Sequence, residues 1–75
     1  MEKEIISIIA TILDLEETEV ELDTVIGDLP EWDSLHHLQI IVALQEKYGI
    51  KYLSSDLVEL EDVADLIKLT KEYLA

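Results

Sequence analysis

Apolar residues recur at helical spacing in three separate stretches of this chain, and no stretch alternates in the way a half-buried strand does. In residues 2–14 the stripe consists of Ile5, Ile8, Ile9, Ile12 and Leu13. In residues 34–48 it consists of Leu35, Leu38, Ile41, Val42 and Tyr48, and in residues 60–74 of Leu60, Val63, Ala64, Ile67 and Leu74. Each stripe predicts an amphipathic helix with one buried face. We therefore expect an all-α fold.

The stretches between these helices indicate how the helices are connected. Residues 15–33 are rich in carboxylates and show no sustained period, which predicts a long loop. Apolar residues are spaced along the loop to anchor it: Val20, Leu22, Val25, Ile26 and Leu29. Gly49 is placed to end the helix over 34–48, and Ser54 or Ser55 can cap a short helical turn through residue 59. We expect a bundle of three main helices plus one short helix, formed as a single domain by residues 1–75.

The charge of the chain excludes several classes of function. It has 5 basic and 18 acidic residues, and so a formal net charge of −13. Nucleic-acid binders need clustered basic side chains, so no nucleic-acid contact is expected.

No run of residues is long and apolar enough for membrane insertion, and the lack of cysteine removes disulfides and thiolate sites. We expect a cytoplasmic monomer that binds proteins with basic surfaces.

The junction between the long loop and the second main helix holds the sequence Trp32-Asp33-Ser34-Leu35. At a helix N-terminus the unpaired backbone N–H groups and the positive end of the helix dipole stabilise a phosphate. Ser34 is therefore a candidate attachment point for a phosphate-linked group. The alternative is that Asp33 or Ser34 serves only as the N-cap of this helix.

Over its whole length the chain resembles the acyl carrier proteins. The resemblance rests on the order of the elements, on Asp33-Ser34-Leu35 at the start of the second helix, and on the segments 46–50 and 61–67. It implies that Ser34 receives 4′-phosphopantetheine from coenzyme A through a phosphopantetheinyl transferase, and that Asp33 contributes to the contact with this transferase. It also implies a carrier of acyl or aminoacyl thioesters that is not itself an enzyme, and no metal site is expected.

The second helix departs from the pattern of carriers in fatty acid synthesis. Glu46 is its only acidic residue, and His36, Gln39 and Gln45 stand where such carriers often have acids. A tryptophan before the motif resembles stand-alone carriers of polyketide, nonribosomal peptide or polysaccharide-modification pathways. We expect a dedicated carrier, with an acyl- or aminoacyl-loading ligase or transferase and downstream synthases as partners. The alternative is a general carrier of fatty acid synthesis.

A docking surface for these partners is predicted beside the motif. Its expected members are Leu35, His36, Gln39, Ile40 and Trp32, because Ile40 and Ala43 lie off the main apolar stripe. Trp32 has a second interpretation, as a ring that covers the junction between loop and helix. Leu38, Ile41, Val42, Val63 and Ile67 are expected in the core, which could also open to shelter an acyl chain.

The two histidines are adjacent on a helix, so their side chains should diverge and cannot share one metal ion. Asp33 and His37 are spaced to pair across one turn.

Ser34 with His37 could also suggest a serine hydrolase, but there is no evident orienting group and little room for a substrate cleft. A further alternative is an acidic helical interaction module without modification, which predicts no gain of phosphopantetheine.

Overall fold

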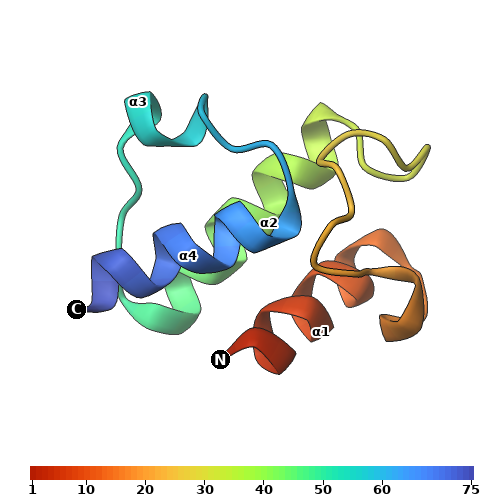
Figure 1. Cartoon of the computed structure of the whole chain (residues 1–75), viewed down its shortest axis with the longest axis horizontal. Coiled ribbons are helices and arrows are strands. Elements are labelled where there is room, and N and C mark those ends of the chain that lie inside the picture. Colours follow the sequence, from red (N-terminus) through yellow and green to blue (C-terminus); the bar gives the residue numbers. More distant parts are fainter.

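Four α-helices and one turn of 3-10 helix form the chain, and the computed structural model describes all 75 residues. The helices are α1 (Glu2–Leu13), α2 (Ser34–Tyr48), α3 (Ser54–Leu57) and α4 (Val63–Leu74). Figure 1 shows α1, α2 and α4 as the three long helices and α3 as a short one. The prediction of an all-α bundle with three main helices and one short helix is confirmed. None of these helices has the length and apolar character that crossing a membrane requires.

The ends of the helices follow from local chemistry. Gly49 adopts the left-handed conformation, with φ 65°, and its N–H donates to the Gln45 carbonyl, so the predicted bounds of α2 are confirmed. Helix α4 begins at Val63, later than predicted, because Asp62 caps it and accepts a hydrogen bond from the Asp65 N–H at 2.8 Å.

The start of α3 differs from the prediction. Leu53 is its N-cap and no side chain caps it, so the prediction of a serine cap is wrong. Tyr73 of α4 holds this segment instead. Its hydroxyl accepts a hydrogen bond from the Leu53 N–H at 2.8 Å and donates one to a carboxylate oxygen of Asp56 at 2.5 Å. A contact from a distant helix therefore replaces a local cap.

One core of 13 buried apolar residues joins the helices. Helix α2 contributes Ile40, Ile41 and Leu44 to this core, and α1 packs against both α2 and α4. The prediction that Leu38 and Val42 are core residues is wrong, since their side chains are 59% and 40% exposed. Helix α2 has apolar residues around most of its circumference, so packing against its neighbours, and not its own sequence, decides which of them are buried.

The long loop is more structured than its sequence predicts. It contains a 3-10 turn, η1 (Glu17–Glu19), in which the Glu16 N–H donates to the Glu19 carboxylate at 2.9 Å. Of the predicted anchors, Val20 is buried and Ile26 and Leu29 pack against the core. The side chains of Leu22 and Val25 do not act as anchors, because these residues are 45% and 51% exposed.

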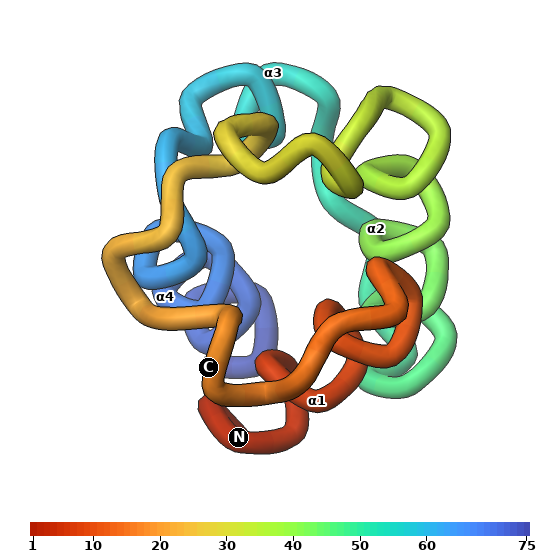
Figure 2. The backbone as a smooth tube through the Cα atoms, turned by 90° about the vertical axis from the view of Figure 1, so that its right-hand side faces the viewer, coloured from red at the N-terminus to blue at the C-terminus, as the bar shows by residue number.

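Backbone hydrogen bonds fasten this loop to the start of α4. The N–H groups of Val63 and Ala64 donate to the carbonyls of Thr24 and Leu22 at 3.0 and 2.9 Å, and the Ile26 N–H donates to the Glu61 carbonyl at 2.9 Å. The first N–H groups of a helix have no partner within it, so the loop supplies the missing acceptors. Figure 2 shows the loop running past α4 before it turns into α2.

Two of the three tyrosines allow a direct comparison of a paired and an unpaired buried hydroxyl. The Tyr52 hydroxyl bonds Thr70 Oγ1 at 2.6 Å inside the core, whereas the Tyr48 hydroxyl is buried with no partner. We expect Tyr52→Phe to lower the free energy of unfolding by about 1 kcal/mol, and Tyr48→Phe to leave it unchanged or raise it. Denaturant unfolding followed by circular dichroism measures both, and equal losses in the two variants would contradict this assignment.

Candidate functional site

The start of α2 is fixed by Asp33. Its backbone is extended, with φ −92° and ψ −176°, and one carboxylate oxygen accepts a hydrogen bond from the His36 N–H at 2.9 Å. This is the geometry of an N-cap, and it decides between the two capping alternatives in favour of Asp33. Ser34 is consequently the first residue of the helix proper.

The Ser34 side chain is exposed and makes no hydrogen bond within the chain. The N–H groups of Ser34 and Leu35 lie in the first turn, where no carbonyl of the helix can accept them. The hydroxyl therefore stands free beside unpaired backbone donors at the positive end of the helix dipole.

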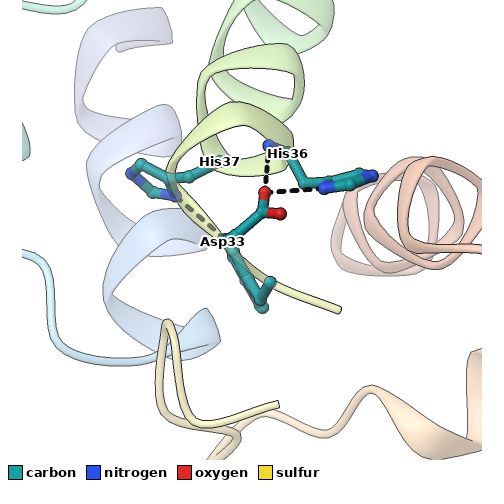
Figure 3. Close-up of polar contacts among 4 residues, drawn as sticks. Asp33, His36 and His37 are labelled. Atoms are coloured by element: carbon teal, nitrogen blue, oxygen red, sulfur yellow. Dashed lines mark hydrogen bonds and ion pairs between the residues drawn. The ribbon is translucent and has the colours of Figure 1, made fainter. Parts of the chain in front are cut away.

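The two histidines that follow Ser34 point to opposite sides of α2, as Figure 3 shows, so the prediction that they diverge is confirmed. His36 Nδ1 lies 2.7 Å from the Asp33 carboxylate and donates to it. The predicted pairing of Asp33 with His37 is wrong. The Asp33 carboxylate is hydrogen-bonded to His36, which points to the opposite side of the helix from His37 (Figure 3). No group of three or more residues is arranged to hold a metal ion.

His37 bonds the indole of Trp32 across the junction between loop and helix. The Trp32 Nε1–H donates to His37 Nδ1 at 3.0 Å, and the two ring centroids are 6.1 Å apart. Trp32 is only 3% exposed, which supports its interpretation as a ring that covers the junction. The sequence pattern did not predict this bond. The only available signal was an indole donor that needed a partner and a histidine five positions later.

Two pKa values in the site move in ways that these contacts explain. The hydrogen bond from the backbone N–H of His36, followed by the bond from its side chain, lowers the pKa of Asp33. Burial of the imidazole lowers the pKa of His37, because the charged form is disfavoured away from water. At neutral pH the site therefore holds an ionised Asp33 and a neutral His37.

An open pocket of about 210 Å³ lies beside Ser34. Its walls come from the end of the loop and the first turn of α2: Ile26, Gly27, Trp32, Asp33, Ser34 and His37. The structure thus brings the free hydroxyl, a half-buried imidazole and part of an apolar wall to one place.

The residues predicted to form the docking surface fall into two groups. Leu35 and Gln39 are exposed and His36 is half-buried. The expectation that Ile40 lies on the exposed face of α2 is wrong, since this residue is fully buried in the core. Trp32 is buried too, so neither of these side chains offers a surface to a partner in this conformation.

A small helical bundle with a free serine hydroxyl at a helix start, and with no enclosed active site, has the architecture of a carrier protein. A family model described as the phosphopantetheine attachment site matches residues 3–70. The chain is also similar to the holo acyl carrier protein of Geobacter metallireducens in its solution NMR structure. The TM-score is 0.86 at 30% sequence identity, with 97% of this chain and 84% of that chain covered. The chain belongs to the phosphopantetheine-attachment family and is a carrier of the acyl carrier protein type.

Family membership settles three questions that the sequence left open. The prosthetic group is covalently bound 4′-phosphopantetheine, which excludes an unmodified interaction module. The protein is a covalent carrier for partner enzymes and not a serine hydrolase. These partners include a phosphopantetheinyl transferase and enzymes of the synthase or transferase kind.

The groups at the start of α2 fit such a prosthetic group. A phosphodiester needs an accessible hydroxyl for its ester bond and donors for its oxygens, and Ser34 stands beside unpaired N–H groups. Ile26 and Trp32 give the adjacent pocket an apolar part of its wall.

The N-cap makes the stability of α2 depend on pH. A lowered carboxylate pKa contributes stability above the ordinary value of 3.8, and this contribution is lost as the pH falls through the lowered pKa. We expect Asp33→Ala to lower the melting temperature at neutral pH, and the difference from the unaltered protein to shrink below about pH 4. Asp33→Asn keeps a capping oxygen, so it should retain most of the stability. Calorimetry across this pH range tests the assignment, which fails if Asn and Ala behave alike.

Proposed function

We propose that Ser34 carries the 4′-phosphopantetheine arm and that the protein shuttles acyl or aminoacyl thioesters in a dedicated biosynthetic pathway. The observation that supports Ser34 is its free, exposed hydroxyl at the first position of α2, beside unpaired backbone donors. Asp33 holds this end of the helix in place and is ionised, so it is also the acid that a transferase meets next to the hydroxyl.

The residues of the chain position the arm and do not perform chemistry on its cargo. When bound, the arm supplies a terminal thiol that holds the cargo as a thioester. A flexible tether keeps that thioester at high effective concentration for each enzyme that docks in turn. The coenzyme A that donates the arm is an intracellular metabolite, so the proposal includes the cytoplasm as the place of action.

The exposed face of α2 supports a dedicated pathway. Three apolar side chains at helical spacing, Leu35, Leu38 and Val42, form an exposed strip that we call the α2 stripe. Leu35 is 61% exposed, and Glu46 is the only carboxylate on the helix. A partner that recognises this face must offer an apolar surface, whereas general fatty acid enzymes would be expected to present basic residues to a carboxylate-rich helix.

Modification of Ser34 can be tested by mass. We expect the protein, incubated with coenzyme A and a broad-specificity phosphopantetheinyl transferase, to gain one phosphopantetheine, and Ser34→Ala to gain none. The double variant Ser54→Ala/Ser55→Ala removes two other exposed serines and should still be modified. Intact mass spectrometry reads the outcome, and circular dichroism verifies that each variant is folded. Full modification of the Ser34→Ala protein would refute the proposed site.

The α2 stripe can be tested by charge substitution. Leu38→Glu should lower kcat/KM of the transferase for the apo carrier by about tenfold or more, because burying an exposed leucine contributes on the order of 1.5–3 kcal/mol. The matched control is Val58→Glu, at an apolar residue that is 82% exposed but lies outside α2. Both substitutions should leave the melting temperature unchanged. Equal losses of kcat/KM in the two variants would indicate a general charge effect and not docking through the stripe.

A further inference from the structure

The pocket beside Ser34 contains a donor that no other part of the chain uses. Ser34 and His37 are one helical turn apart on the same side of α2, and both line this pocket. Ile26 and Gly27 line the pocket from the loop, and Trp32 forms part of its wall.

The bond from Trp32 fixes which nitrogen of His37 carries the hydrogen. An indole nitrogen can only donate, so His37 Nδ1 must accept and be free of hydrogen. The neutral ring therefore carries its hydrogen on Nε2. This N–H makes no hydrogen bond within the chain, and it is not sealed off from solvent, because the only buried side-chain polar atom without a partner is the Tyr48 hydroxyl.

His36 has the opposite arrangement. Its Nδ1 carries a hydrogen that is donated to Asp33, and its ring lies on the other side of the helix (Figure 3). Asp33 is the only ionised side chain in the pocket lining, and one of its carboxylate oxygens accepts both hydrogen bonds from His36. His37 is therefore the residue of the pocket lining, besides Ser34, that has a free side-chain donor. His36 does not line the pocket and uses its Nδ1–H on Asp33.

On the basis of the proposed modification of Ser34, we propose that His37 donates a hydrogen bond from Nε2 to the phosphodiester of the arm, and that Ile26 and Trp32 receive its dimethyl group. A phosphodiester oxygen is a strong acceptor, and a bond to an ionised group is stronger than one between neutral groups. The arm then leaves α2 toward the loop of residues 14–33 and not along the α2 stripe. Trp32 and His37 are positioning residues, because Trp32 orients the imidazole and the imidazole orients the arm.

The direct test is proximity in the holo protein. With an isotope-labelled arm loaded onto unlabelled protein, we expect nuclear Overhauser effects from the dimethyl group to the Trp32 and Ile26 side chains. Effects to Leu38 and Val42 would mean that the arm lies along the α2 stripe, and the absence of any effect would mean that it moves freely in solvent. Either result overturns the proposal.

A second test follows the phosphorus itself. A phosphodiester does not titrate near neutral pH, so any inflection of its phosphorus resonance there reports a neighbouring group. We expect an inflection that matches the titration of His37, and we expect the pKa of His37 to be higher in the holo than in the apo protein, since an adjacent anion favours the protonated ring. His37→Gln should abolish the inflection, whereas His36→Gln should keep it.

These outcomes separate this proposal from the one on which it rests. If Ser34 gains no phosphopantetheine, the attachment site itself is wrong. If Ser34 is modified but His37 titrates identically in the apo and holo proteins, only the role of His37 fails. An inflection that survives in His37→Gln and disappears in His36→Gln would assign the contact to the other histidine and would also overturn the proposal.

Discussion

The rotation of α2 about its own axis is the constraint on which the rest of the structure depends. A chain of 75 residues builds a single core cluster, and α2 must give it one face. Because Ile40, Ile41 and Leu44 face inward, Leu35, Leu38 and Val42 are left on the surface. The same rotation sends His36 and His37 to opposite sides of the helix (Figure 3), and it leaves His37 in the lining of the pocket beside Ser34.

This rotation could not be obtained from the sequence, although the helix itself could. The bounds of α2 are encoded locally, by the Asp33 cap and by the left-handed Gly49, and both are readable from residue type. Its buried face is not encoded locally, because apolar residues surround most of the helix and several rotations bury a similar amount of apolar surface. Packing against α1 selects one of these rotations. This is why Leu38, which was expected in the core, is exposed, and Ile40, which was expected on the surface, is buried.

The position of the long loop, like the rotation of α2, is determined by contacts with residues that are distant in the sequence. Its carboxylates and lack of period indicate a loop. The carbonyls of residues 22 and 24 in this loop, however, accept hydrogen bonds from N–H groups of α4 that lie about forty positions later in the chain. These bonds hold the loop close to the core, and the loop ends at Trp32, whose buried indole orients His37. Sequence motifs can identify Ser34 and Asp33, whereas the partner of an imidazole depends on which side chains the tertiary fold brings together.

The distribution of charge and apolar surface divides recognition into two stages. Carboxylates are concentrated in the loop and near α3 and the start of α4, so the long-range field that attracts a basic partner arises mainly outside α2. Helix α2 contributes short-range contact through its exposed apolar residues, which act only after the surfaces meet. Salt screens the first stage and leaves the second largely intact. A carrier built in this way can meet its partners quickly, discriminate among them by the shape of the apolar patch, and still dissociate after each transfer.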